Sequence, residues 1–164
     1  MMFASQCWQR ATSVGAIATL QLGLSVAIVS QPAAAAKENP FGVCTEELLA
    51  VGFDNNTVAA ACGRALLPDE LSLCVISIVQ DANVDAAFAL DNCFRVRRPD
   101  ELAVCALEID EAFMLEDPTA VVDSCRRSIL PLRFSDCVTG VGLGADVTVD
   151  TALKNCLAAD NNQL

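Results

Sequence analysis

The spacing of the cysteines constrains this chain more than any other feature of its sequence. The last eight of its nine cysteines are separated by 18, 12, 19, 12, 20, 12 and 19 residues. Four long gaps thus alternate with three short ones, which gives four repeats with a period of about 31 residues. A fixed period of this size is typical of stacked supersecondary units, each too small to bury its own apolar face. The eight positions are Cys44, Cys62, Cys74, Cys93, Cys105, Cys125, Cys137 and Cys156.

An octapeptide recurs in register with these cysteines. Residues 68–75 read PDELSLCV, residues 99–106 read PDELAVCA, and residues 131–138 read the more distant PLRFSDCV. Proline suits the first turn of a helix, where its missing N–H is not needed, and acidic residues suit the positive end of the helix. The octapeptides therefore predict equivalent helices in consecutive repeats, each beginning at its proline.

Apolar residues recur at helical spacing around the cysteine of each predicted helix. In the second unit the stripe is Leu71, Cys74, Val75, Ile78 and Val79, which follows the i, i+3, i+4, i+7, i+8 pattern of a buried helix face. A turn rich in Gly, Asn, Asp or Pro then precedes a second helix in every unit. The sequence predicts an all-α fold, a linear array of four helical hairpins over residues 41–160, with helices of about 8–12 residues that are marginal alone.

Two cysteine pairings are compatible with such hairpins. The longer gaps are centred on the turns within hairpins, and the 12-residue gaps are centred on the prolines between hairpins. Pairing across the 12-residue gaps would leave Cys44 and Cys156 without partners at opposite ends of the array. Pairing within hairpins uses all eight cysteines and is favoured, although both alternatives stay open. The favoured bridges are Cys44–Cys62, Cys74–Cys93, Cys105–Cys125 and Cys137–Cys156.

Residues 1–36 have the features of a secretory signal peptide. Arg10 is their only charge, residues 14–29 are mostly apolar, and four alanines end the segment. A positive start, an apolar core and small residues at the end predict cleavage after Ala36. An uncleaved membrane anchor is the alternative, but the apolar run is shorter and more polar than the ~20 residues of a spanning helix.

The mature chain, residues 37–164, is strongly acidic. It holds all 21 acidic residues and nine of the ten basic ones, so its net charge is −12. This charge disfavours binding to nucleic acid and to anionic membrane surfaces, because both require cations. We expect residues 37–40 to form a short linker, residues 161–164 to form a polar tail, and no membrane association after cleavage.

The residue types of the mature chain argue against an enzyme. It has no His, Tyr or Trp, so the usual general base and the Ser-His-Asp and Cys-His systems are missing. Its cysteines lack the close pairs that zinc prefers, and an even number in an exported chain indicates disulfides. Residues 81–85 and 146–150 resemble part of a calcium loop but lack its glycine and final glutamate, and turn and cap roles explain them. We expect no catalytic residue, no cofactor and no metal.

Glycines recur at positions 140, 142 and 144. With Ala145 they partly match a dinucleotide-binding fingerprint, but no strand precedes them as that fingerprint requires. We expect these glycines to weaken the helix that contains them, and residues 142–146 to form the turn of the last hairpin.

Arginines gather at the turns between hairpins, whereas acidic residues occupy the turns within hairpins. One arginine follows each of the first three second-helix cysteines by two residues, and we expect these to cap helix ends or to pair with acidic residues 69, 70, 100 and 101. They are Arg64, Arg95 and Arg127. The alternative is an edge that docks an acidic protein partner, with Arg97, Arg98 and Arg126 as its candidate residues.

The octapeptide series, with FRVRRP at 94–99 and SCRRSILP at 124–131, resembles that of a group of small exported cyanobacterial cysteine-repeat proteins. The resemblance covers nearly all of the mature chain. It implies a cyanobacterial source and no activity. The signal peptide predicts export to the periplasm or the cell exterior, and in a cyanobacterium the thylakoid lumen is a further destination.

Three classes of function are compatible with these observations. A non-enzymatic interaction module with an unknown protein partner is favoured, because helical-hairpin arrays present extended surfaces. A periplasmic redox-responsive protein would need one labile disulfide among structural ones. A two-carboxylate hydrolase is disfavoured, because the mature chain lacks the aromatic side chains that form sugar platforms.

Overall fold

The computed structural model of the protein describes residues 39–161, and the expected signal peptide lies outside them. The described residues form eight helices joined in consecutive hairpins, which confirms the all-α array of four hairpins. The first helix begins one residue before the expected position, and the last one extends one residue beyond it. The helices are α1 (Pro40–Val51), α2 (Asn55–Arg64), α3 (Pro68–Asp81), α4 (Ala86–Phe94), α5 (Pro99–Phe113), α6 (Thr119–Arg127), α7 (Pro131–Gly144) and α8 (Val149–Asn161).

One disulfide joins the two helices of each hairpin. The Cα atoms of each pair lie 5.9–6.0 Å apart, within the normal range for a disulfide. The pairing is the favoured one within hairpins, and pairing across the 12-residue gaps is excluded. The four bridges are Cys44–Cys62, Cys74–Cys93, Cys105–Cys125 and Cys137–Cys156.

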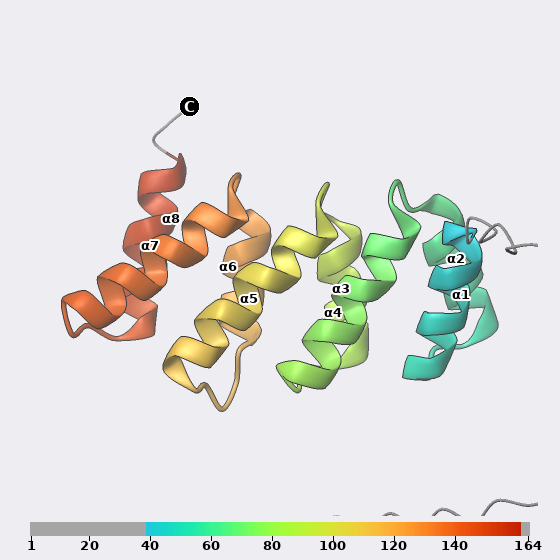
Figure 1. The fold of residues 1–164 in the computed structure, drawn as a ribbon, viewed down its shortest axis with the longest axis horizontal. Coiled ribbons are helices and arrows are strands. Elements are labelled where there is room, and N and C mark those ends of the chain that lie inside the picture. Colours follow the sequence, from blue (N-terminus) through green and yellow to red (C-terminus); the bar gives the residue numbers. More distant parts are fainter. Residues whose placement is uncertain (1–38, 162–164) are drawn as a thin grey trace, which may run out of the picture. The chain divides into compact units, whose positions relative to one another are not determined.

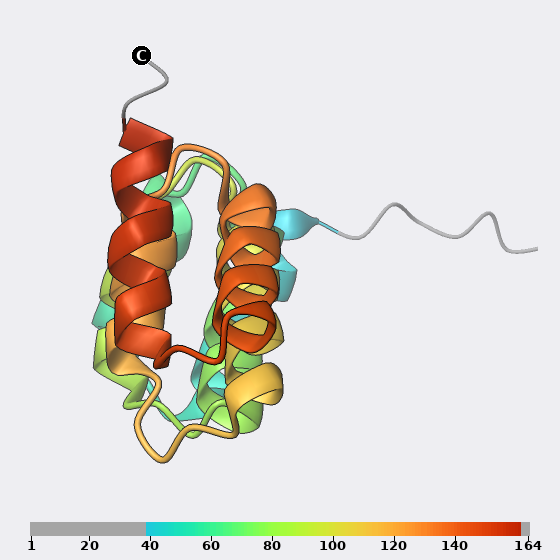
Figure 2. The ribbon, with the colours of Figure 1, turned by 90° about the vertical axis from the view of Figure 1, so that its left-hand side faces the viewer.

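The eight helices form two layers (Figures 1 and 2). The first helices of the hairpins, α1, α3, α5 and α7, pack side by side in one layer, and the second helices pack less closely against one another in the other layer. The predicted apolar stripes lie between these layers, with Leu48, Ile78 and Ile109 fully buried. Because all hairpins run in the same direction, the turns between hairpins gather at one edge, at the top of Figure 1, and the turns within hairpins gather at the opposite edge.

Local sequence explains where the helices begin. Each first helix starts with a proline in its first turn. Asp54 caps α2 by accepting hydrogen bonds from the N–H groups of Asn56 and Thr57, at 2.9 and 3.2 Å. Asp85 caps α4 by accepting a hydrogen bond from the Phe88 N–H at 3.0 Å. The first of the two calcium-like segments thus supplies a helix cap.

The polar residues of the turns within hairpins also have a conformational role. Asn83 and Asp146 adopt left-handed backbone conformations with φ of 52° and 53°. Asn and Asp tolerate this conformation better than other non-glycine residues. Both residues belong to the calcium-like segments, so turn formation accounts for these positions as well.

A part-buried polar pair recurs between neighbouring first helices. The Ser72 hydroxyl in α3 donates to Glu47 Oε2 in α1 at 2.5 Å, and the Ser135 hydroxyl in α7 donates to Glu108 Oε2 in α5 at 2.5 Å. Each glutamate lies three residues after the first cysteine of its repeat. Each serine lies two residues before the first cysteine of the next repeat. Between α3 and α5 these positions hold Ser77 and Ala103, so glutamate and its serine partner are lost together. The pair thus joins two of the three interfaces between neighbouring first helices.

The longer helices are the main departure from the sequence-based expectation. α3, α5 and α7 contain 14, 15 and 14 residues, more than the expected maximum. The prediction that residues 142–146 form a turn is wrong, because α7 continues through Gly144 and Gly142 is buried within it. The glycines of this segment were interpreted as a turn signal, whereas Gly142 lies where α7 packs closely against Phe113 of α5.

No helix among residues 39–161 is long and apolar enough to cross a membrane. Four disulfides in so short a chain are typical of an oxidising compartment outside the cytoplasm.

Candidate functional site

The three turns between hairpins enter the next helix with the same backbone conformation. The residue before each proline, Leu67, Arg98 or Leu130, has φ between −133° and −128° and ψ between 77° and 81°. The clash between a proline ring and the preceding residue favours such extended values over helical ones. In the repeat, Arg97 of the second turn is equivalent to Ile129 of the third, since each lies two residues before its proline.

A carboxylate binds to the third of these turns. Asp160, near the end of α8, accepts hydrogen bonds from the Ser128 hydroxyl at 2.7 Å and from the Ile129 N–H at 2.8 Å. The matching N–H of Arg97 has no hydrogen-bond partner among the described residues. The backbone of an inter-hairpin turn can thus hold a carboxylate, and no carboxylate within residues 39–161 occupies the matching N–H of the second turn.

Arginine side chains surround the second turn. A pocket of about 430 Å³ lies between the α4–α5 and α6–α7 turns, and Glu101 is its one acidic lining residue. Its walls combine cationic with apolar side chains. We call it the arginine pocket; its lining includes Arg95, Arg97, Arg98, Arg126, Val96, Ile129 and Pro131.

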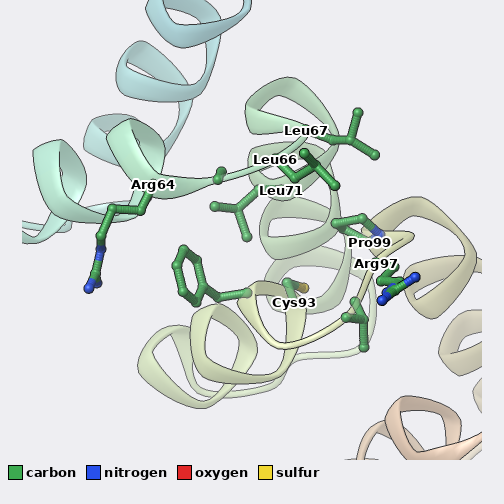
Figure 3. A pocket seen from close by; sticks show the side chains of 10 residues that line it. Arg64, Leu66, Leu67, Leu71, Cys93, Arg97 and Pro99 are labelled. Carbon is green, nitrogen blue, oxygen red and sulfur yellow. The ribbon is translucent and has the colours of Figure 1, made fainter.

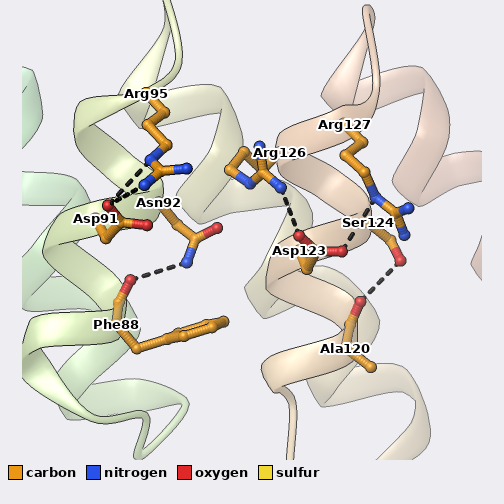
Figure 4. Close-up of polar contacts among 9 residues, drawn as sticks. All are labelled: Phe88, Asp91, Asn92, Arg95, Ala120, Asp123, Ser124, Arg126 and Arg127. Carbon is orange, nitrogen blue, oxygen red and sulfur yellow. Dashed lines mark hydrogen bonds and ion pairs between the residues drawn. The ribbon is translucent and has the colours of Figure 1, made fainter.

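Most of these arginines have an acidic neighbour on their own helix (Figure 4). Arg95 pairs with Asp91 at 2.8 Å, and Arg126 pairs with Asp123 at 2.6 Å. Arg127 contacts the other oxygen of Asp123 at 3.1 Å. Arg95 and Arg127 thus stabilise their helices through i,i+4 ion pairs rather than by bonding terminal carbonyls.

The remaining arginines differ in their partners. Arg64 Nε donates to the Ala60 carbonyl at 2.9 Å, the capping role expected of it. Arg98 pairs with Glu101 at 2.8 Å, and its side chain is 64% exposed. Arg97 is exposed and has no ion pair among the described residues. The structure places all three docking candidates, Arg97, Arg98 and Arg126, in one pocket. Arg98 and Arg126 have ion pairs there, and Arg97 has none among the described residues.

Asp69, Glu70, Asp100 and Glu101 were expected to pair with Arg64, Arg95 and Arg127, but these three arginines have partners on their own helices. Glu101 pairs with Arg98 instead. Glu70, in the first turn of α3, lies instead beside Asp100 in the first turn of α5. Partial burial and the negative charge of Asp100 raise the pKa of Glu70 above its ordinary value. Arginines find nearer carboxylates three or four residues away on their own helices, so cross-turn pairing is not needed.

A second pocket adjoins the arginine pocket and is more apolar (Figure 3). It has a volume of about 260 Å³ and lies between the α2–α3 and α4–α5 turns. Arg64 and Arg97 lie at opposite sides of it, and Leu66, which is 83% exposed, lies at its rim. The Arg64 guanidinium lies 5.4 Å from the centre of the Phe94 ring, a cation–π contact. Arg97 lines both pockets, so the two form adjacent parts of one edge.

Reasoning from the sequence missed the role of Asp160. A signal was present, because Asp160 follows its cysteine by four residues, as Arg97 and Ile129 follow theirs. The equivalent position holds Leu66, Arg97 and Ile129 in the first three hairpins, so the acidic Asp160 distinguishes the last hairpin from them.

Comparison with known proteins adds no relative: no protein-family model, no curated protein and no solved structure matches this chain.

Proposed function

We propose that this protein is an exported, non-enzymatic interaction module that binds an acidic segment of a partner protein in the arginine pocket. Arg97, Arg98 and Arg126 would contact carboxylates of the partner, and Val96 and Ile129 would contact an apolar side chain beside them. One observation carries this proposal: four arginines and several apolar side chains line the same pocket, and Glu101 is the one acidic residue in its lining.

The docked Asp160 supports it, because this contact has the chemistry that the partner would use. A carboxylate already accepts hydrogen bonds from the turn that forms one wall of the pocket. On the α4–α5 turn, the Arg97 N–H is available to a carboxylate, and the guanidinium groups nearby add charge. Hydrogen bonds between charged partners are shorter and stronger than neutral ones.

The existing ion pairs would oppose such binding only weakly. The side chains of Arg98 and Arg126 are paired within their own helices, at 64% and 27% exposure. The exposed Arg98 pair contributes about 0–1 kcal/mol, so a partner carboxylate can replace it. The Arg126 pair is part-buried, and a partner carboxylate would share it with Asp123.

The charge of the rest of the protein restricts the kind of partner. The mature chain has a net charge of −12, so an extensively acidic surface would be repelled outside the pocket. A short acidic segment with an adjacent apolar side chain fits better than a highly acidic domain.

The test is a titration with labelled peptides, followed by fluorescence anisotropy. A peptide with two glutamates beside a leucine should bind, and the peptide with glutamines in their place should bind about tenfold more weakly or not at all. Binding should weaken as salt is raised, because salt screens the attraction between exposed charges, with a Debye length of about 8–10 Å at physiological ionic strength.

Two variants locate the site. Arg97→Ala should weaken binding of the acidic peptide without changing thermal stability, since Arg97 has no ion pair in the described residues. Arg127→Ala is the matched control, because Arg127 is exposed at 52% but does not line the pocket. Equal effects of both variants, or no preference for the acidic peptide, would refute the proposal.

Export is part of the proposal and rests on the leader sequence and the four disulfides. The mature protein should begin at Lys37 and be recovered from the periplasm or the exterior of the cell. Sequencing the N-terminus of the native protein tests this, and an intact Met1 in a membrane fraction would favour the anchor instead.

A redox-responsive protein is the second candidate, because one disulfide differs from the others. Cys137 is only partly buried, whereas the other seven bridged cysteines are buried. It lines a small cavity of about 40 Å³ together with Cys156, the cationic Arg133 and the acidic Asp160. A cation near a cysteine favours its thiolate, the form that takes part in exchange.

A graded series of glutathione buffers separates the two candidates. The redox function requires Cys137–Cys156 to open well before the other three bridges, as read by thiol labelling and peptide mapping. A structural role for all four bridges requires that no single bridge opens in the range of cellular glutathione potentials.

A further inference from the structure

The first hairpin exposes residues that every later hairpin buries. Phe41, three residues before the first cysteine of the repeat, is 49% exposed. In the later repeats the same position is covered by the preceding hairpin and is at most 2% exposed. These equivalent residues are Leu71, Leu102 and Phe134. The outer face of α1 therefore has the apolar character of an internal repeat interface, and no other described residues cover it.

The last hairpin exposes the complementary position. Val141, four residues after the first cysteine of its repeat, is 39% exposed. Its equivalents Leu48, Ile78 and Ile109 are fully buried, and each lies on a first helix that packs against the first helix of the next hairpin. Figure 2 looks onto this end of the array, where α7 and α8 face the viewer. Each end thus presents one half of the interface that recurs inside the protein.

The polar groups of the two end faces allow them to meet. The Thr45 hydroxyl on α1 donates to the Phe41 carbonyl of its own helix at 2.7 Å, so burial would leave it hydrogen-bonded. At the positions that hold serine and glutamate in the internal interfaces, the end faces hold Gly42 and Gly140. Neither face would bury a carboxylate without its hydroxyl partner.

We propose that copies of this protein associate head to tail, with the α1 face of one copy against the α7 face of the next, in the register of the internal repeat interfaces. The occupant of each end is a second copy because the two faces continue an interface that the chain already forms three times. Such an interface joins two different surfaces and leaves one of each free, so it builds open chains rather than closed dimers. This inference is independent of the arginine pocket, which lies at the turns between hairpins.

Analytical ultracentrifugation tests the proposal, with the exported protein purified after expression of the full-length gene. The wild type should form a concentration-dependent series of oligomers. Phe41→Asp or Val141→Asp should each raise the apparent dissociation constant by about a hundredfold, because each would bury an unpaired carboxylate in the interface. Leu73→Asp is the matched control, because Leu73 is 52% exposed on α3, away from both ends, and its variant should associate as the wild type does.

Mixing the two end variants tests the polarity of the contact. Phe41→Asp retains an intact α7 face, and Val141→Asp retains an intact α1 face. An equimolar mixture should form a one-to-one dimer and nothing larger, although each variant alone stays monomeric. Association of either variant with itself would show a symmetric contact and overturn the proposal.

A gain-of-contact pair tests the register. Gly140→Glu alone should weaken association, since the glutamate would face Gly42 of the next copy without a donor. Adding Gly42→Ser should restore association by about tenfold, through the hydrogen bond that Glu47 and Ser72 make inside the protein. A wild type that is monomeric at all concentrations, or a double variant that associates no better than Gly140→Glu, would overturn the proposal.

Discussion

The ring of Phe113, at the end of α5, packs directly against Gly142 in α7. A β-carbon on Gly142 would lie 3.0 Å from Phe113 Cε1 and closer still to Cζ, which real side chains do not tolerate. Gly142 is buried in a regular helix, so packing between helices, and not backbone freedom, requires glycine here. This contact joins the third and fourth hairpins.

Replacing this glycine should destabilise the protein although alanine is the better helix former. We expect Gly142→Ala to lower the free energy of unfolding by about 1–3 kcal/mol, the usual effect of overpacking a core. Gly63→Ala in α2 is the control, because nothing lies within 4 Å of a β-carbon there. That variant should be neutral or more stable by up to about 1 kcal/mol. Urea unfolding with the disulfides intact measures both, and equal effects would contradict the packing argument.

The Glu47–Ser72 pair makes a second prediction. Ser72→Ala would leave the part-buried Glu47 carboxylate without its hydroxyl donor, so we expect a loss of about 1–3 kcal/mol in unfolding free energy. Adding Glu47→Ser reproduces the Ser77 and Ala103 combination that already joins α3 to α5.

The double variant should therefore recover most of the lost stability. A double-mutant cycle by urea unfolding gives the coupling between the two positions, which we expect to exceed about 0.5 kcal/mol. Additive effects would show that the hydrogen bond does not set the register of the stack.

The sequence predicted the hairpin array because local and long-range signals agreed. The cysteine period, the octapeptide prolines and the apolar stripes all required two helices per repeat, and the array ends favoured the disulfide pairing that the structure has. The length of α7 was not predicted, because a glycine such as Gly142 indicates a helix end unless the residue that packs against it is known. Phe113 is 29 residues away in the sequence and supplies the reason for that glycine.

The arginine pocket could be predicted only in part. Repeat positions showed that Arg97, Arg98 and Arg126 would lie at one edge, since all turns between hairpins fall there. Which arginines are already paired depends on rotamers and on nearby carboxylates of the same helix. The binding of Asp160 to a turn 31 residues earlier depends on how α8 packs, which no local pattern reports.

The raised pKa of Glu70 predicts a pH dependence of stability. Burial and the charge of Asp100 raise this pKa above its ordinary value of 4.5, so between the two values the folded protein binds more protons than the unfolded chain. The unfolding free energy should therefore fall as pH rises through this window, and the unfavourable contribution should be absent below it. Glu70→Gln should remove this part of the pH dependence in urea unfolding from acid to neutral pH. An unchanged profile would show that Glu70 titrates normally.

The last prediction separates internal from terminal disulfides. Cys74–Cys93 and Cys137–Cys156 close loops of the same length, with a sequence separation of 19 residues, so chain entropy assigns each about 3 kcal/mol. Their surroundings differ, because α3 and α4 have neighbours on both sides whereas α7 and α8 have a neighbour on one side only.

Removing the internal bridge with paired alanine substitutions should lower the global unfolding free energy by about 3 kcal/mol. Removing the terminal bridge in the same way should instead open α8 locally, since in a stacked array each repeat depends on its own contacts and those of its nearest neighbours. Amide hydrogen exchange should then show lost protection in α8 with α3 and α5 unchanged. Loss of protection throughout both variants would mean that the four hairpins unfold as a single cooperative unit, and the terminal hairpin would not be a separate element of stability.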